Sequence, residues 1–167
     1  IDAVYIASPN KLHIEQARVF LEHGKHVICE KPLSAHAKDV AELQALAKER
    51  GLIYLEAIMF MHLPQRKLLE EALKKIGDIS VAKIDFCQRS SKYDAYLAGS
   101  LPNIFNPALE TGALMDLGVY CVYPALYLFG KPQNTLAVSH LLASGADGSD
   151  IVAMQYPDKL VNLVFSK

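Results

Sequence analysis

The sequence predicts an α/β chain, in which half of a doubly wound parallel sheet over residues 1–60 precedes an incomplete α+β unit over residues 61–167. In the first part, short apolar runs alternate with amphipathic stretches over short connections, which is typical of parallel strands joined by right-handed helical crossovers. In the second part this alternation stops. Apolar runs separated by turn signals there indicate an open, mainly antiparallel sheet.

Three strands and two helices are expected in the first part. The strand-forming runs are residues 3–7, 26–29 and 52–58. The first run lacks polar alternation, which favours a strand covered on both faces. A helix should begin at Asn10 as its N-cap and end before Gly24, and a second should begin at Ser34 and end before Gly51. Parallel strands then present their carboxyl ends, where such sheets bind ligands, at a single edge.

The second part is predicted to hold one long helix and a small sheet. A helical stripe over residues 68–76 is followed by a strand over 79–87 and a long loop through 109. Residues 112–129 read as a helix. Three further strands are expected over residues 136–143, 150–156 and 160–165, joined as a meander by turn signals.

Composition excludes several classes of partner. The 17 basic and 18 acidic residues are interspersed, so no surface for nucleic acid is indicated. The longest apolar stretch, residues 117–129, contains Pro124 and is shorter than the roughly 20 residues of a membrane span. No secretion signal is apparent, which favours a cytoplasmic protein. The chain opens at Ile1 inside a strand, so we expect an internal piece of a longer protein.

No metal site is expected. The three cysteines, Cys29, Cys87 and Cys121, lack metal-ligand spacing and are interpreted as buried free thiols in a reducing compartment. The closest histidine pair is His23 and His26, but Gly24 between them interrupts the helix that would hold both rings on one face.

Two groups of residues could carry chemistry. Lys31 follows a predicted central strand and precedes a proline, so it could donate a hydrogen bond or proton to a substrate oxygen. Asp116 and Tyr120, four residues apart on a helix, could combine a carboxylate with an acid–base phenol. Taken singly, the residues fit simpler interpretations better: a solvated lysine, a surface carboxylate and a core tyrosine.

A series of motifs decides between these interpretations. In order they are Ser8-Pro9-Asn10, His13, Gly24-Lys25-His26-Val27, Glu30-Lys31-Pro32, Glu56-Ala57-Ile58-Met59 and the segment Gly112-Ala113-Leu114-Met115-Asp116-Leu117-Gly118-Val119-Tyr120. In order and spacing they resemble the motifs of the glucose-fructose oxidoreductase, inositol dehydrogenase and MocA family. The closest likeness is to its dihydrodiol dehydrogenase and sugar dehydrogenase members.

The resemblance implies a nicotinamide-dependent oxidoreductase. Residues 1–60 would be the later part of a Rossmann domain, with Lys31, Asp116 and Tyr120 catalytic and the Lys31-Pro32 bond cis. The residues implied around the nicotinamide end of NAD or NADP are Ser8, Pro9, Asn10, His13, Glu30, Pro32 and Glu56. Hydride would move between the cofactor and a secondary alcohol or carbonyl of a sugar, polyol or cyclic diol.

The sequence also departs from the family pattern. Tyr120 stands where many members have a histidine, and Glu110-Thr111 with a single Gly112 replace a glycine pair. No GxGxxG occurs, so the resemblance implies that the turn that binds the pyrophosphate would lie outside this chain, together with the residue that selects NAD or NADP.

The implied partners are a small-molecule substrate and further copies of the protein, associating through the C-terminal sheet. The competing hypothesis is a non-catalytic, nucleotide-sensing or scaffolding member of the same fold.

Overall fold

A computed structural model describes residues 1–167, which form two compact units. Unit 1 comprises residues 1–58 together with 108–110, and unit 2 comprises residues 59–107 and 111–167.

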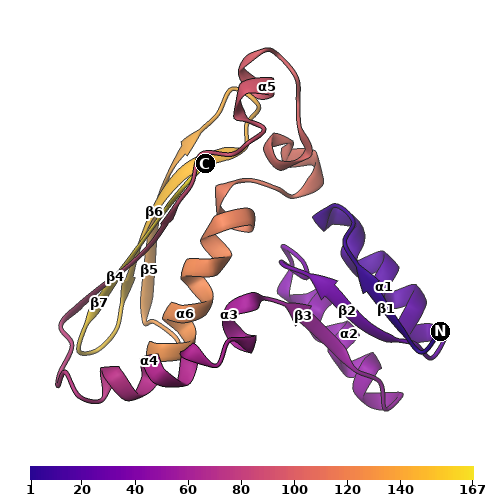
Figure 1. Ribbon diagram of the computed structural model, residues 1–167, viewed down its shortest axis with the longest axis horizontal. Helices are drawn as coiled ribbons and strands as arrows, with labels where there is room; N and C mark the ends of the chain where they lie inside the picture. Colours follow the sequence, from indigo (N-terminus) through magenta and orange to yellow (C-terminus); the bar gives the residue numbers. More distant parts are fainter. The chain divides into compact units, whose positions relative to one another are not determined.

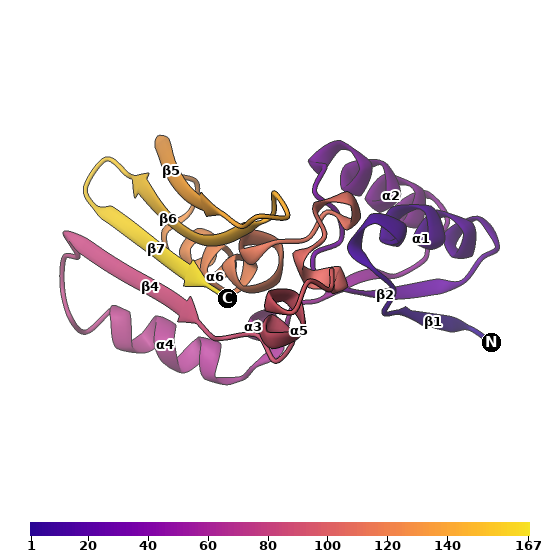
Figure 2. The same cartoon turned by 90° about the horizontal axis from the view of Figure 1, so that it is seen from above.

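Unit 1 is a three-stranded parallel sheet covered by two helices. The strands β1 (Ala3–Ile6), β2 (His26–Glu30) and β3 (Tyr54–Ala57) lie in the order β1-β2-β3. Helices α1 (His13–Glu22) and α2 (Ala37–Glu49) are the two crossovers, and both lie on the same face of the sheet (Figures 1 and 2). The predicted parallel α/β arrangement is confirmed.

The core of unit 1 lies between this sheet face and the two helices. Its fully buried side chains include Leu21 of α1, Leu43 of α2 and Val27 of β2. On the opposite face, one row of the parallel register runs across all three strands and is exposed: Tyr5 by 56%, Ile28 by 38% and Leu55 by 45%. The expectation that the first strand is covered on both faces is therefore wrong for this chain, because both helices cover one face.

The starts of the two helices differ from the predictions, whereas their ends agree. Asn10 begins a short 3-10 turn and makes no side-chain cap, and its amide N–H donates to a distant carbonyl oxygen. The Ser34 hydroxyl accepts the His36 N–H at 3.0 Å, and α2 starts only after this local turn. Gly24 and Gly51 adopt positive φ angles of 71° and 66°, as expected of residues that end a helix.

Unit 2 is built on a mixed four-stranded sheet. Its strands β4 (Val81–Cys87), β5 (Asn134–Leu141), β6 (Asp147–Gln155) and β7 (Leu160–Ser166) lie in the order β4-β7-β6-β5. The predicted antiparallel meander is β5-β6-β7, and β4 adds to it by parallel pairing with β7. The helices are α3 (Met59–His62), α4 (Gln65–Leu73), α5 (Tyr93–Leu97) and α6 (Val119–Phe129).

One face of this sheet carries the core of unit 2. The predicted long helix is a five-residue π-helical turn, Leu114–Gly118, that continues into α6 and packs on β7. Gly118 makes this close packing possible, since a Cβ there would lie 2.8 Å from the Phe165 ring. Figure 1 shows α6 on one side of the nearly edge-on sheet, and the other side is bare in unit 2.

The segment that follows β4 is more ordered than the predicted long loop. It contains α5 and two 3-10 turns, Asn103–Phe105 and Pro107–Leu109. The ring of Phe105 is fully buried, with ring centroids of Tyr93 and Tyr96 at 5.6 and 4.9 Å. This aromatic packing explains an order that local propensity does not reveal.

The three cysteines are free, as expected, but only Cys29 and Cys121 are buried. Cys87 is exposed at the last residue of β4, so its interpretation as a buried thiol is wrong. No helix combines the length and the apolar character needed to cross a bilayer. No three His, Cys, Asp or Glu side chains gather as metal ligands would.

Candidate functional site

In unit 1, the candidate cofactor residues meet at the carboxyl edge of the sheet. Ser8 follows β1, Lys31 follows the central strand β2, and Glu56 is the residue before the last in β3. Parallel pairing brings these strand ends side by side, since Cys29 of β2 is in register with Ile6 on one side and with Glu56 on the other. This is the edge at which open parallel sheets bind ligands.

His13 ties the ends of β1 and β2 together. Its ring is completely buried, with Nε2 2.8 Å from the Ser8 carbonyl oxygen and Nδ1 2.8 Å from the Pro32 carbonyl oxygen. Carbonyl groups removed from water need hydrogen-bond donors, and the His13 ring, in the first turn of α1, lies against two of them and donates to at least one. His13 thus fixes the backbone just after β1 and just after β2.

Glu56 secures the turn after Lys31 from the other side. Its Oε1 accepts the backbone N–H of Leu33 at 3.1 Å. Burial raises the pKa of the Glu56 carboxyl, while the Leu33 hydrogen bond and the nearby His13 act in the opposite direction. The Lys31-Pro32 peptide bond between these contacts is cis, as the resemblance implied.

Glu30 and Asn10 make further contacts around this edge. Glu30 accepts hydrogen bonds from the Tyr5 hydroxyl and, at 3.3 Å, from the backbone N–H of Lys31. The Asn10 amide donates to the Glu110 carbonyl oxygen at 2.9 Å. Glu110 has a φ of 57°, so the left-handed geometry that suits glycine persists here in a non-glycine residue.

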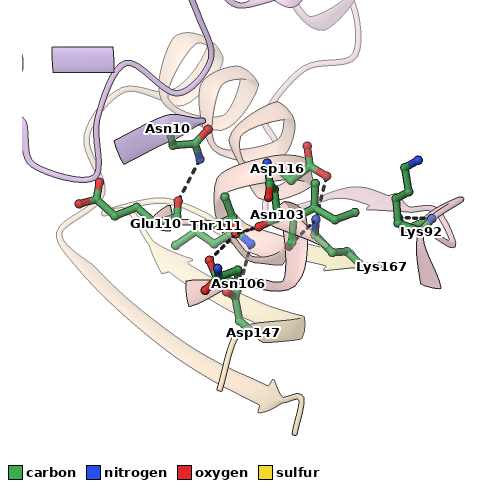
Figure 3. A network of polar contacts seen from close by, with 12 residues as sticks. Asn10, Lys92, Asn103, Asn106, Glu110, Thr111, Asp116, Asp147 and Lys167 are labelled. Atoms are coloured by element: carbon green, nitrogen blue, oxygen red, sulfur yellow. Dashed lines mark hydrogen bonds and ion pairs between the residues drawn. The ribbon is translucent and has the colours of Figure 1, made fainter. Parts of the chain in front are cut away.

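In unit 2, Asp116 and Tyr120 lie one turn apart, as predicted. Asp116 belongs to the π-helical turn and Tyr120 to the first turn of α6, where its ring packs edge to face on Phe86 with centroids 5.6 Å apart. π-helical turns of this kind are frequent at functional sites. Asp116 also has a partner that the sequence did not suggest, because Lys167 Nζ donates to its Oδ2 at 2.8 Å (Figure 3).

The segment before Asp116 is held by side-chain contacts to the backbone. The Thr111 hydroxyl lies 2.6 Å from the Asn103 carbonyl oxygen and 2.9 Å from that of Asn106 (Figure 3). Asp147 Oδ2 accepts the backbone N–H of Leu114 at 2.6 Å, which places a carboxylate at the start of the helical segment. These contacts fix the helix that carries Asp116.

Sequence reasoning missed Lys167 and the role of Asp147. A signal for Lys167 exists in the alternation of β7: Val161, Leu163 and Phe165 face the core, so the next residue on that face is Lys167. A lysine in that position requires a partner of opposite charge or a hydrogen-bond acceptor. The residues around Asp147 indicate only a turn, and no local pattern links Asp147 to Leu114.

Comparisons with known proteins agree with this architecture. Residues 1–58 match the oxidoreductase family with an NAD-binding Rossmann fold, and residues 66–166 match the GFO/IDH/MocA C-terminal domain. The chain is 46% identical over 166 residues to scyllo-inositol 2-dehydrogenase (NADP(+)) IolU of Bacillus subtilis, covering 99% of this chain and 51% of that protein.

More distant relatives include trans-1,2-dihydrobenzene-1,2-diol dehydrogenase of Mus musculus, 32% identical over 94% of this chain and 46% of that protein. Among solved structures, the 3-ketoreductase KijD10 of Actinomadura kijaniata, crystallised with TDP-benzene and NADP, is 29% identical with a TM-score of 0.82. That match covers 99% of this chain and 49% of KijD10.

The chain thus spans about half the length of the curated relatives it matches. Matches to both characteristic domains, in the expected order and over nearly the whole chain, settle its classification. The chain belongs to the GFO/IDH/MocA oxidoreductase family.

Proposed function

We propose that the full-length protein is an NAD(P)-dependent dehydrogenase that oxidises a secondary alcohol of a polyol, sugar or cyclic diol, or reduces the matching carbonyl. The observation that carries the proposal is the fixation of the backbone around Lys31. His13 and Glu56 hold Pro32 and Leu33, the two residues that follow this lysine, at the carboxyl end of the central strand. Relatives named as inositol and dihydrodiol dehydrogenases support the substrate class.

The side chains at the strand ends suit the nicotinamide half of a dinucleotide. Ser8, Asn10, Glu30 and Lys31 are all partly exposed and offer a hydroxyl, an amide, a carboxylate and an ammonium. These groups can hydrogen-bond a carboxamide and ribose hydroxyls, with Pro9, His13, Pro32 and Glu56 shaping and supporting the edge. When bound, the nicotinamide ring exchanges a hydride with the substrate carbon.

NADP is the cofactor we propose. Its support is the name of the B. subtilis relative and the NADP in the KijD10 crystals. Purified full-length protein should give a higher kcat/KM with NADP than with NAD. The reverse order would overturn this choice without affecting the reaction class.

Three residues of the chain would hydrogen-bond the substrate or transfer its proton. The Lys31 ammonium would donate a hydrogen bond to it and stabilise the charge that develops there. Tyr120 would take the hydroxyl proton during oxidation and return it during reduction. Asp116 would accept hydrogen bonds from substrate hydroxyls and orient them.

The decisive experiment measures nicotinamide absorbance with a panel of inositols, sugars and cyclic diols, and with the matching ketones. Full-length wild-type protein should turn over at least one of these compounds. Lys31→Met should lower kcat by about three orders of magnitude with an unchanged Kd for the cofactor. Cofactor binding without turnover of any compound would favour a nucleotide-sensing or scaffolding protein instead.

We also propose that the protein associates with copies of itself through the sheet of unit 2. Large apolar side chains are exposed on this sheet, including Leu136 by 70%, Val138 by 66% and Ile151 by 57%. Contiguous apolar surfaces of this kind are typical of subunit interfaces.

A further inference from the structure

Lys167 is a buried cation at the end of β7. Its side chain is only 1% exposed, and its Nζ donates to Asp116 Oδ2 at 2.8 Å and to the Ile104 carbonyl oxygen at 3.3 Å. The ring centroid of Phe105 lies 5.4 Å from the same nitrogen. A lysine taken out of water needs partners of this kind, and an anion, a carbonyl dipole and an aromatic face supply them.

The backbone of Lys167 is fixed as firmly as its side chain. Its N–H donates to the Gly148 carbonyl oxygen at 2.9 Å, which extends the pairing of β7 with β6 by one residue. Since the alternation of β7 also directs this side chain to the core face, the ammonium has a defined position. The ammonium can therefore fix the position of the Asp116 carboxylate.

Asp116 contributes the other half of the pair and remains partly accessible. Its side chain is 37% exposed, whereas that of Lys167 is sealed from solvent. An exposed surface ion pair would have little effect, but here one partner is fixed in the core and the other reaches solvent. The carboxylate acts as acceptor toward Lys167 and so remains suited to accept from substrate hydroxyls.

We propose that Lys167 is a positioning residue, which holds the Asp116 carboxylate in the orientation that the reaction requires. This inference rests on the proposed function, in which Asp116 binds and orients the substrate. The end of β7 thereby supports the helix that carries Asp116 and Tyr120.

The test compares Lys167→Met, Lys167→Arg, Asp116→Asn and the Lys167→Met/Asp116→Asn double variant in the full-length protein. Methionine has a similar length and no charge, so it can fill the buried site. The protein then folds, but the Asp116 carboxylate loses the ion pair that orients it. We expect kcat/KM for the substrate to fall about 10- to 100-fold in Lys167→Met, with an altered pH profile of kcat and unchanged cofactor binding. Arginine should restore part of the loss.

The double variant separates positioning from general damage. If Lys167 acts through Asp116, adding Lys167→Met to Asp116→Asn should change kcat/KM by less than about twofold, because the interaction is already lost. Fully multiplicative effects of the two substitutions would overturn the inference.

Lys159, the residue just before β7, offers a matched control. It is 17% exposed, pairs with Asp158 at 2.6 Å and lies 6.0 Å from the Phe129 and Tyr156 rings. Lys159→Met should leave the kinetics unchanged. Wild-type kinetics in Lys167→Met would overturn the positioning role alone, whereas a wild-type protein without turnover of any compound would overturn the proposed function itself.

Discussion

The Asp147 carboxylate occupies the space into which a side chain at Gly112 would extend. A Cβ added to Gly112 would lie 1.6 Å from Asp147 Oδ1. The second oxygen of the same carboxylate accepts the Leu114 N–H at 2.6 Å. The glycine therefore leaves room for the acidic group that binds the start of the helical segment carrying Asp116 and Tyr120.

Substituting Gly112→Ala should displace the Asp147 carboxylate and break its bond to Leu114. We expect a loss of about 2 kcal/mol in the free energy of unfolding, measured by urea denaturation of the full-length protein. In an Asp147→Ala background the same substitution should cost less than half as much, because the clash is then absent. Equal costs in both backgrounds would contradict the steric explanation.

Replacing His13 tests the connection between the strand ends. His13→Ala removes the ring contacts to the Ser8 and Pro32 carbonyl oxygens, leaves at least one of these oxygens without a donor and opens a cavity. The free energy of unfolding should fall by about 2 to 4 kcal/mol, and kcat should fall with it because the backbone beside Lys31 loosens. His23→Ala, at an exposed position just after the same helix, should change both quantities little. Wild-type kcat in a folded His13→Ala protein would separate His13 from the function of Lys31.

The alternation of apolar runs was sufficient to predict the parallel sheet of unit 1 and the meander of unit 2. Both features depend on short-range periodicity, which the sequence displays directly. The starts of the helices were predicted less well. Asn10 is a good capping residue by type, but its amide bonds to the Glu110 carbonyl, 100 residues further along the chain. Such a competing partner is invisible to local propensity.

In the candidate site, too, local sequence patterns predict some features, whereas contacts between distant residues are not predicted. The motif order predicts Lys31, Asp116 and Tyr120 as candidate catalytic residues, and the structure adds contacts between segments that are distant in sequence. The ion pair between Asp116 and Lys167 joins residues 51 positions apart. Only the two-residue period of β7 indicates that Lys167 faces the core, and that period says nothing about which carboxylate it meets.

Asp150 should make stability depend on pH. The pKa of its carboxyl is raised from 3.8 to about 6, chiefly by burial and also by the nearby Asp147, while a hydrogen bond from Ser139 opposes the shift. The folded-state pKa lies above the unfolded value, so the protonated Asp150 carboxyl contributes to the free energy of unfolding. This stabilisation is fully present below about pH 3.8 and is lost as the pH rises through about 6.

Asp150→Asn removes this titration while keeping the shape of the side chain. At pH 7 the variant should unfold with a free energy on the order of 1 to 2 kcal/mol above that of wild type, and the difference should vanish near pH 4. Thermal or urea unfolding of both proteins across this range gives the comparison. Parallel curves for wild type and variant would contradict the assigned ionisation.

The exposed face of the unit 2 sheet should determine the oligomeric state. Val138 of β5 and Ile151 of β6 are paired across neighbouring strands and are both more than half exposed, so a charge on either side chain would enter the centre of an apolar contact. We expect Val138→Glu and Ile151→Glu to convert an oligomeric full-length protein into a monomer at micromolar concentration, as measured by light scattering. Lys83→Glu alters the charge at an already polar position of β4 and should have a smaller effect. A wild-type protein that is monomeric at the same concentration would show that this surface serves no self-association, and the exposed apolar row would then need a different partner.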